Sequence, residues 1–318
     1  MAKENPHPPR QPNGSSGARK RALATESNTV GLLPQGDWHK RNFLTEVLIP
    51  SIFARRSGAS RNPEFTDIKR GSVCITWIGH ASFLLRTANC NILIDPNWAN
   101  WLKVVKRLKH PGLDIHDLPE IDLVLITHAH FDHLDRNSLR TIARDQPIVV
   151  PAGVGNLVHD LGFRDVHELD EWDDLAIDGV DITLTPCAHW GARVLHDSHR
   201  GYGGYIVEFD GRSVYHCGDS AYFDGFREIG RQREIEIALL PIGAYDPPSG
   251  REVHMNPEQA MQTFLDLQAD VLIPMHYGSF RLSYEPLHEP PQRLVEAAHQ
   301  HGVVDKLRIL REGEPAVL

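Results

Sequence analysis

The chain has 318 residues, of which 41% are hydrophobic and 24% are charged, and its formal net charge is −9. This composition allows a sizeable buried core, and no apolar stretch approaches the roughly 20 residues that a membrane-spanning helix needs. Residues 1–70 carry 12 Lys or Arg and 6 Asp or Glu, so the remaining residues carry a net charge of −15, which argues against a nucleic-acid partner.

The N-terminal residues offer little that could be buried. Residues 1–37 are rich in Pro, Gly, Ser and charge, which predicts a disordered tail followed by one folded domain over residues 38–318. The N-terminus lacks the apolar core of a secretory signal, so we expect a cytoplasmic protein. The cysteines form no CxxC pair and are expected to be reduced thiols. They are Cys74, Cys90, Cys187 and Cys217.

From about residue 71 the sequence becomes a series of short apolar runs separated by turns, as in strands. Strands are predicted in SVCITWIGH, SFLLRT, NILIDP, IDLVLITH, QPIVVPAG, DVHELD, VDITLTPCAH, GYIVEFDG, RSVYHCGDS, EIEIALLPIG and ADVLIPMHYG. Helices are predicted in SLRTIARDQ, VGNLVHDLG, NPEQAMQTFLDLQ and PPQRLVEAAHQHG. Because helices alternate with strands in both halves, we expect two sheets packed face to face with helices outside, an α/β (α+β) architecture.

The stretch THAHFDHLD, residues 127–135, places three histidines and two aspartates directly after an apolar run. His128 and His130 are two positions apart, so on an extended segment they project to the same side. Asp132 and His133 are adjacent, and a turn into the following helix would let them reach a second metal about 3.5–4 Å from the first. The spacing therefore favours two metal ions over one.

Three later strands each end on a further candidate ligand. TLTPCAHW ends on His189, VYHCGDS on Asp219 and LIPMHYG on His276. A single His or Asp after a strand is usually a turn residue or a satisfied polar group, but residues that carry chemistry also gather on the loops at strand ends. Four strand ends that all supply His or Asp amount to a full set of ligands, so the sequence predicts a metal centre.

This pattern, HxHxDH after a strand and then His, Asp and His at three later strand ends, resembles the metallo-β-lactamase fold superfamily over about residues 71–312. Further strings resemble the branch that contains N-acyl phosphatidylethanolamine-hydrolysing phospholipase D, with ascorbate-6-phosphate lactonase-like proteins as more distant relatives. They are WIGHASFLL, IDPNW, ELDEWD, CAHWGAR, GDSAYFDGFREIG, LPIGAYDP, HMNPEQA and MHYGSF. The resemblance implies a four-layer αββα sandwich.

The resemblance also implies a centre of two divalent metal ions. It assigns His128, His130 and His189 to the first ion, and Asp132, His133 and His276 to the second, with Asp219 bridging the two. Imidazole and carboxylate ligands without a thiolate suit Zn²⁺, and also Fe or Mn. The oxygen-reducing di-iron relatives usually have Glu where this chain has His130, which favours hydrolysis over redox chemistry.

The expected reaction is hydrolysis of a phosphodiester, on a small molecule or a lipid, by a hydroxide that bridges the two metals. Asp132 and Asp219 would orient this hydroxide and accept its proton. His254, in HMNP, would contact the substrate phosphate or assist the leaving group, or else serve only as a loop or capping residue. A lactone or another carboxylic ester is the alternative substrate, and a redox di-iron enzyme and a non-catalytic metal-binding protein are more distant alternatives.

Two residues outside the ligand set also lie at strand ends. Asp95 is expected either to accept a hydrogen bond from a ligand histidine or only to form an Asp-Pro turn. His80 is expected to face the site without being a ligand.

Two segments bear on the substrate. PPSGREVH, residues 247–254, is polar where lipid-cleaving relatives tend to be aromatic, which does not favour acyl-chain recognition. Residues 97–112, NWANWLKVVKRLKHPG, combine tryptophans with Lys and Arg, as in segments that lie on an anionic membrane surface or attract a phosphorylated substrate. The alternative is an ordinary solvated face. LIPSIFARR, residues 48–56, raises the possibility of peripheral membrane contact less strongly.

Overall fold

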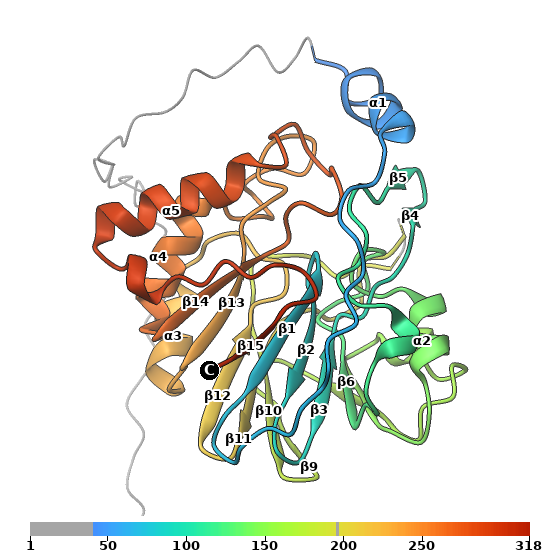
Figure 1. The fold of residues 1–318 in the computed structure, drawn as a ribbon, viewed down its shortest axis with the longest axis vertical. Helices are drawn as coiled ribbons and strands as arrows, with labels where there is room; N and C mark the ends of the chain where they lie inside the picture. Colours follow the sequence, from blue (N-terminus) through green and yellow to red (C-terminus); the bar gives the residue numbers. More distant parts are fainter. Residues whose placement is uncertain (1–40, 195–196) are drawn as a thin grey trace, which may run out of the picture. The chain divides into compact units, whose positions relative to one another are not determined.

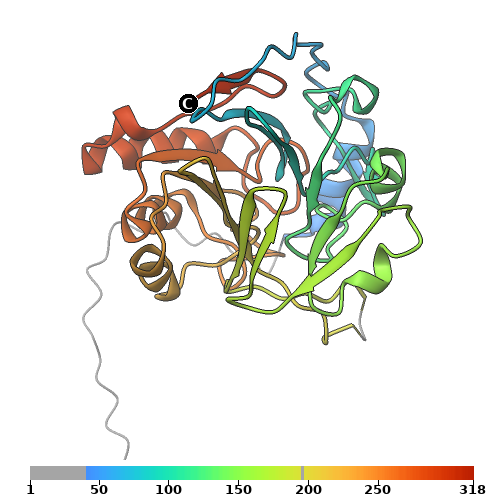
Figure 2. The ribbon, with the colours of Figure 1, turned by 90° about the horizontal axis from the view of Figure 1, so that it is seen from below.

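Two β-sheets face each other in the computed structural model, which describes residues 41–194 and 197–318 (Figure 2). The predicted tail, residues 1–37, lies outside the described residues. The seven strands of the first sheet are, in order across it, β15 (Pro315–Val317), β1 (Cys74–Gly79), β2 (Ser82–Arg86), β3 (Asn91–Ile94), β6 (Leu123–Leu125), β7 (Ile148–Pro151) and β8 (Val166–Leu169). The six strands of the second are β14 (Val271–Met275), β13 (Ile237–Pro241), β12 (Arg212–His216), β11 (Gly204–Phe209), β10 (Val180–Thr185) and β9 (Asp174–Ile177).

Helices cover the outer face of each sheet (Figures 1 and 2). The α-helices are α1 (Ile49–Phe53), α2 (Arg136–Ile142), α3 (Gly225–Gln232), α4 (Pro257–Leu267) and α5 (Glu289–His301). Shorter turns are the π-helix η2 (Leu44–Leu48) and the 3-10 helices η3 (Ile115–Asp117), η4 (Gly155–Leu157) and η5 (Val304–Lys306). α4 packs on β13 between α3 and α5, whereas α2 packs on the first sheet. The predicted αββα sandwich is confirmed.

The alternation of side chains along the strands explains how the layers form. In β2, Phe83 and Leu85 join the core between the sheets, while Leu84 joins a second core under α2. In β3, Leu93 likewise points to the second core. Because both faces of these strands are buried, their sequences read as continuous apolar runs rather than alternating ones.

The predicted metal-binding motif lies where β6 passes into α2. The strand ends at Leu125, and α2 begins after Asp135, whose carboxylate accepts hydrogen bonds from the backbone N–H of Ser138 at 3.0 Å and from its hydroxyl at 2.6 Å. This N-cap satisfies one of the free N–H groups of the first turn. The two ends therefore hold the loop 126–135 in a defined position.

One predicted helix is wrong. VGNLVHDLG contains only the 3-10 turn Gly155–Leu157, because Gly155, Asn156 and the β-branched valines favour an α-helix weakly. Conversely, α3, β9 and β15 were not predicted. Two glycines lower the helix propensity of α3, and β9 and β15 are short strands without a strong apolar pattern.

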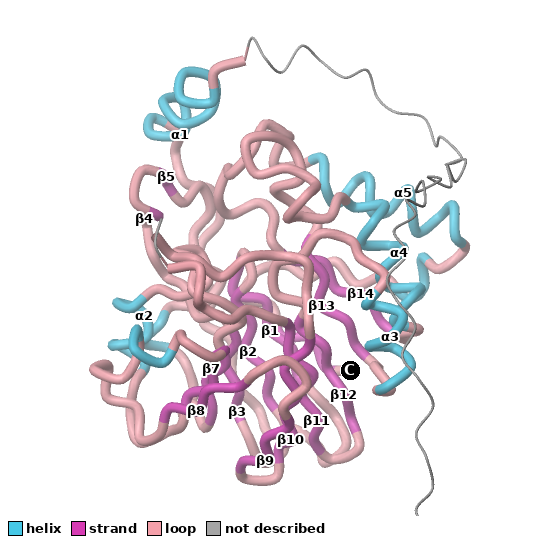
Figure 3. Tube along the Cα trace, turned by 180° about the vertical axis from the view of Figure 1, so that it is seen from behind, coloured by secondary structure: helices cyan, strands magenta, loops and turns pink. Residues whose placement is uncertain are grey.

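A small lobe lies beside these layers. It consists of η2, α1 and residues 54–56, together with a hairpin of β4 (Trp101–Leu102) and β5 (Val105–Lys106). We call it the α1–hairpin lobe, comprising residues 44–56 and 99–109. Figures 1 and 3 show α1 and the hairpin side by side at one end of the domain. Within the described residues, every helix is too short or too polar to cross a bilayer.

The predicted state of the cysteines is confirmed. All four are free thiols, and Cys74, Cys90 and Cys217 are buried.

Candidate metal centre

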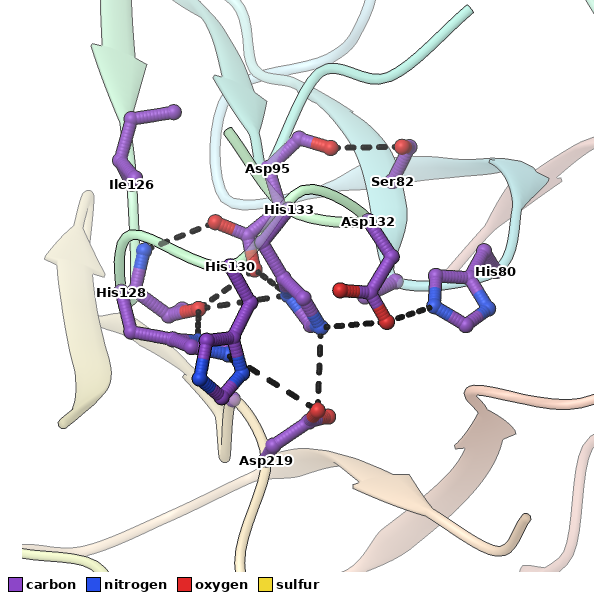
Figure 4. A network of polar contacts seen from close by, with 12 residues as sticks. His80, Ser82, Asp95, Ile126, His128, His130, Asp132, His133 and Asp219 are labelled. Carbon is purple, nitrogen blue, oxygen red and sulfur yellow. Dashed lines mark hydrogen bonds and ion pairs between the residues drawn. The ribbon is translucent and has the colours of Figure 1, made fainter. Parts of the chain in front are cut away.

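The structure brings all seven predicted ligands together at the ends of four strands. Figure 4 labels His128, His130, Asp132, His133 and Asp219 among them. One group consists of His128, His130, His189 and Asp219, and a second of His80, Asp132, His133 and His276. Within each group the ligand atoms lie within 4.8 Å of one another. Asp219 also forms a third group with His254 and His276.

In the first group, three imidazole nitrogens face one another. His130 Nδ1 lies 3.0 Å from His128 Nε2 and 3.3 Å from His189 Nε2. Asp219 Oδ2 lies 3.8 Å and 3.9 Å from the Nε2 atoms of His128 and His189. A tetrahedral zinc ion with Zn–N bonds of about 2.0–2.1 Å keeps its ligand atoms about 3.3 Å apart, so the spacing fits one ion among the three nitrogens.

The hydrogen bonds of Nδ1 in His128 and His189 determine whether Nε2 of the same ring can bind a metal. Thr127 Oγ1 donates to Asp95 Oδ2 at 2.6 Å, so at 3.0 Å it accepts from His128 Nδ1. His189 Nδ1 donates to the carbonyl oxygen of Val253 at 2.9 Å. In a neutral imidazole only one nitrogen carries a proton. Both Nε2 atoms therefore present lone pairs inward, and a cation between them is the partner that satisfies both.

The second group places histidines between carboxylates. His133 Nδ1 donates to Asp95 Oδ2 at 2.7 Å, and its Nε2 lies 3.1 Å from Asp219 Oδ2 and 3.7 Å from Asp132 Oδ2. His276 Nε2 lies 3.1 Å from Asp219 Oδ2 and 3.4 Å from Asp132 Oδ2. Asp219 Oδ2 is thus close to ligand atoms of both groups, which is the position of a bridging ligand.

The pKa values of the histidines show how strongly Asp132 and Asp219 attract positive charge. Burial lowers the pKa of His130 to about 4 and holds that of His128 well below its usual value. Burial acts in the same direction on His276, but Asp219 and Asp132 outweigh it and raise the pKa of His276 to about 9. The same carboxylates raise the pKa of His133 well above its usual value. The second group therefore attracts positive charge, which a divalent ion would supply.

Several buried polar atoms of the cluster have no hydrogen-bond partner among the described residues. They are His130 Nε2, His254 Nδ1, His276 Nδ1 and Asp219 Oδ1. Leaving such an atom unsatisfied costs about 1–3 kcal/mol. Together with a donor set of imidazole and carboxylate without thiolate, these atoms fit a site built for metal ions.

Asp95 supports the ligands from behind. Its carboxylate accepts hydrogen bonds from the Thr127 N–H at 2.7 Å, the Thr127 hydroxyl and His133 Nδ1. It therefore fixes the ring orientation of His133 directly and that of His128 through Thr127. Of the two expected roles of Asp95, hydrogen bonding to a ligand histidine is the one that the structure shows.

His80 lies against the second group. Its Nε2 is 3.0 Å from Asp132 Oδ2, and its ring centroid is 4.0 Å from that of His276. Burial lowers the pKa of His80 to about 3, so the ring is neutral and its Nε2–H donates to the carboxylate. The sequence indicated only that His80 faces the site, because its partner Asp132 lies 52 residues away.

His254 lies at the edge of the cluster. It is buried, with Nδ1 3.9 Å from Asp219 Oδ2 and its ring centroid 5.1 Å from that of His189. Burial lowers the pKa of His254 to about 3, so the ring is neutral. The preceding residue, Val253, accepts the hydrogen bond from His189, which joins the PPSGREVH segment to the first group.

Ser220, in the GDS sequence, has a structural role. Its hydroxyl accepts a hydrogen bond from the Ala188 N–H at 2.9 Å and donates to the carbonyl oxygen of Ala221 at 2.6 Å. Both contacts of this hydroxyl are with the backbone of neighbouring loops.

The rim of the cluster carries aromatic and basic side chains that the sequence did not indicate together. Trp190 is half-exposed and meets His130 edge-on, with ring centroids 4.4 Å apart. Phe131, between two predicted ligands, has the Arg193 guanidinium carbon 4.0 Å and the Lys103 Nζ 4.4 Å from its ring centroid. Residues 103, 131 and 193 are far apart in sequence, so only the folded chain shows this grouping.

The sequence and the fold were compared with known proteins. Residues 90–277 match the family model described as a β-lactamase superfamily domain. The chain is 30% identical over 243 residues to N-acyl-phosphatidylethanolamine-hydrolyzing phospholipase D 1 of Caenorhabditis elegans, a match that covers 70% of this chain and 68% of that protein. It is 30% identical over 245 residues to a UPF0173 metal-dependent hydrolase of Methanopyrus kandleri, a match that covers 76% of this chain and 97% of that one.

Among solved structures, the fold is similar to Igni18, a metallo hydrolase from the archaeon Ignicoccus hospitalis. The TM-score is 0.61 at 27% identity, and the alignment covers 78% of this chain and 98% of that one. These comparisons confirm the resemblance that the motif and the strand-end ligands predicted.

Proposed function

Because the chain belongs to the β-lactamase superfamily and is a metal-dependent hydrolase of that superfamily, we propose that it hydrolyses a phosphodiester with two divalent metal ions, most simply zinc. The observation that carries the proposal is the position of Asp219, whose Oδ2 lies 3.1 Å from His133 and His276 and within 3.9 Å of His128 and His189. One carboxylate thus serves two sets of ligands.

In this proposal, His128, His130 and His189 hold one ion, Asp132, His133 and His276 hold the other, and Asp219 is shared. Bound metal ions supply a nucleophile near neutral pH by lowering the pKa of water, and they stabilise charge on the reacting oxygen.

The protein side chains have separate roles. His80 donates to Asp132 and fixes the direction of its carboxylate. The surrounding histidines outweigh the effect of burial and hold the pKa values of Asp132 and Asp219 well below the usual range. Both carboxylates therefore stay anionic, and in the proposed reaction they orient the attacking water and accept its proton. The neutral His254 contacts the substrate phosphate or assists the leaving group.

The charge at the rim favours a phosphodiester over a neutral ester. Lys103 and Arg193 flank Phe131 beside the ligands, in a chain whose net charge is −9. Two cations beside the ligands raise the local concentration of an anionic substrate, whereas they have little effect on a neutral lactone. The similarity to a phospholipase D points in the same direction.

The test compares two classes of substrate on zinc-loaded protein. Bis(p-nitrophenyl) phosphate and N-acyl phosphatidylethanolamine represent phosphodiesters, and γ-butyrolactone and p-nitrophenyl acetate represent carboxylic esters. We expect turnover of the phosphodiesters, its loss with EDTA and its return with zinc. Turnover of the esters alone would replace the proposal with the lactonase alternative.

Metal analysis separates the remaining alternatives. Protein isolated with iron and a visible absorption band would favour a redox enzyme. Two bound zinc ions without turnover of either class would favour a metal-binding protein. Well under one equivalent of metal after loading would overturn the metal centre itself. A cytoplasmic location completes the proposal, and cell fractionation tests it.

A further inference from the structure

The α1–hairpin lobe exposes an unusual amount of apolar surface. Of the eleven large hydrophobic side chains that are exposed among the described residues, six belong to this lobe. They are Leu44, Ile49, Ile52, Phe53, Trp101 and Val104. Phe53 is 81% exposed and Val104 is 64% exposed. Contiguous exposed apolar surface on a folded protein marks an interaction site.

The lobe is a built surface and not a loose end of chain. Lys106 Nζ donates to the carbonyl oxygens of Ile52 and Ala54, both at 2.8 Å, which joins the hairpin to α1. Arg56 Nε donates to the carbonyl oxygen of Arg107 at 3.1 Å. These bonds fix the backbone of α1 beside the hairpin (Figures 1 and 3), while the six large apolar side chains stay exposed.

The charge of the lobe is opposite to that of the chain as a whole. Residues 44–56 and 99–109 contain six Lys or Arg and one acidic residue, Glu46, whereas the whole chain carries −9. Arg107 is an exception to the basic face that its sequence suggested. It is buried and donates to the carbonyl oxygens of Asn97 and Ala99. Arg55 and Lys103 remain exposed beside the apolar side chains.

We propose that the α1–hairpin lobe docks on the surface of an anionic lipid bilayer. Trp101, Val104 and Phe53 would enter the boundary between headgroups and acyl chains, where a tryptophan ring is favoured, and the basic residues would contact anionic headgroups. Lys and Arg near such a surface are attracted by its negative potential. A second copy of the lobe fits less well, because two basic surfaces repel each other.

The lobe is continuous with the metal centre through two contacts. Lys103 lies over the ring of Phe131, between predicted ligands in sequence, at 4.4 Å. The Arg107 guanidinium carbon lies 4.4 Å from the ring centroid of Phe280, whose ring centroid lies 5.1 Å from that of His80. A docked lobe therefore holds the rim of the cluster beside the bilayer.

How a docked lobe would present a substrate to the metals rests on the proposed function. A lipid phosphodiester could reach the metals with its headgroup while its acyl chains stay in the bilayer. The polar PPSGREVH segment then needs no acyl-chain pocket. Docking itself requires no turnover, so the two ideas can fail separately.

The test is sedimentation of the full-length, zinc-loaded protein with vesicles. One set is pure phosphatidylcholine, and the other contains 30 mol% phosphatidylglycerol. We expect binding to the anionic vesicles that weakens as salt rises from 50 to 500 mM, and at least tenfold weaker binding to the neutral ones. No binding to either set would overturn the proposal.

Variants locate the surface. The triple variant F53S/W101S/V104S is expected to lower partitioning to anionic vesicles at least tenfold. Ile52→Ser and Ile309→Ser form a matched pair, because both side chains are 42% exposed and only Ile52 lies in the lobe. Ile52→Ser should weaken binding severalfold and Ile309→Ser should not. Arg55→Glu should likewise weaken binding, whereas Arg231→Glu, on α3, should leave it unchanged.

Two further measurements keep docking distinct from its rivals. Hydrolysis of bis(p-nitrophenyl) phosphate, a soluble substrate, should be equal in the wild type and the triple variant. If the proposed function fails and neither turns it over, vesicle binding still decides the docking proposal. Equal vesicle binding by the triple variant and the wild type would overturn it. Sedimentation velocity that shows a dimeric wild type and a monomeric triple variant would also overturn it. That result would assign the lobe to contact between copies of the chain.

Discussion

The cluster of candidate metal ligands and the α1–hairpin lobe depart from the ordinary distribution of side chains in opposite directions. The cluster buries charged and polar groups, with Asp219 and His128 only 2% and 1% exposed. The lobe exposes apolar groups, with Phe53 81% exposed. A buried charge is costly unless it is paired, and an exposed apolar patch marks a contact surface. Each departure indicates something that the chain binds.

The two regions also differ in how they are held. In the cluster, the side chains themselves are fixed by partners such as Asp95 and Thr127. In the lobe, bonds to the backbone fix the main chain and the apolar side chains stay free. Substitutions in the cluster should therefore change metal affinity by large factors. Substitutions in the lobe should change docking on the bilayer and leave the free energy of unfolding almost unchanged.

The largest effect is expected for Asp219→Asn, which keeps the shape of the side chain and removes its charge. Phosphodiester hydrolysis should fall about a thousandfold or more, since the groups of one centre act as a unit. Zinc content should fall from two ions towards one. Asp266→Asn is the control, because Asp266 is a largely buried carboxylate on α4 that pairs with Arg227 away from the cluster. Full activity with two zinc ions in the Asp219 variant would contradict the bridging role.

A smaller effect is expected for Asp95→Asn. The neutral amide of the variant is a weaker acceptor for the hydrogen bond from His133 than the carboxylate. Zinc affinity should therefore fall about 10–100-fold. Competition with a fluorescent chelator measures this. Asp122→Asn is the matched control, because Asp122 accepts from the Asn91 N–H at the opposite end of β3. Equal affinities in the two variants would show that Asp95 serves only the turn.

The seven predicted ligands could be placed from the sequence because each stands at the end of an apolar run. That signal is local, and the fold brings the strand ends together. The structure shows that the seven side chains converge. Their binding of metal stays a prediction.

The roles of His80 and the rim could not be predicted in the same way. They depend on contacts across long stretches of chain, such as the 52 residues between His80 and Asp132. The lobe was indicated only by composition. Its basic segment contains both the exposed Lys103 and the buried Arg107, and no periodicity in the sequence separates them.

Substitution of His80 is expected to change zinc affinity by about tenfold or less. In His80→Ala the hydrogen bond to Asp132 is lost, and zinc affinity should fall by up to about tenfold. His80→Gln keeps a donor of similar reach on the same strained backbone, so part of the affinity should return. The difference between the two variants, measured by chelator competition, isolates the hydrogen bond. Identical affinities would assign His80 to packing alone.

Asp246 extends the comparison to a partly buried carboxylate outside the cluster, where burial and acidic neighbours outweigh the nearby Arg293 and Arg41. Burial and the neighbouring Glu285 raise its pKa from 3.8 to about 6. The folded state therefore holds this proton more tightly than the unfolded state, and stability is lost as the pH rises from about 4 to 6.

Asp246→Asn removes this loss. The variant should be more stable than the wild type by on the order of 1 kcal/mol at pH 8, with the difference shrinking as the pH falls through 6. Urea unfolding at pH 5 and pH 8 measures it. A difference that is the same at both values would show that Asp246 does not titrate in this range.

The smallest effect is expected in the lobe. The triple variant F53S/W101S/V104S should change the free energy of unfolding by less than about 1 kcal/mol, because exposed side chains contribute little. Urea unfolding of the zinc-loaded proteins tests this. A larger loss would mean that these side chains stabilise the fold, and the contrast with the cluster would disappear.

Three residues around the cluster have left-handed backbone: His80 with φ 56°, Asp95 with φ 46° and His276 with φ 61°. Each follows a strand, and for a residue with a side chain this conformation costs about 1–2 kcal/mol. The backbone holds these three residues in one strained conformation, so little conformational freedom remains to be lost when a ligand binds. At these positions glycine would relieve the strain and remove the chemistry. Selection for stability and selection for function therefore act on the same three residues in opposite directions.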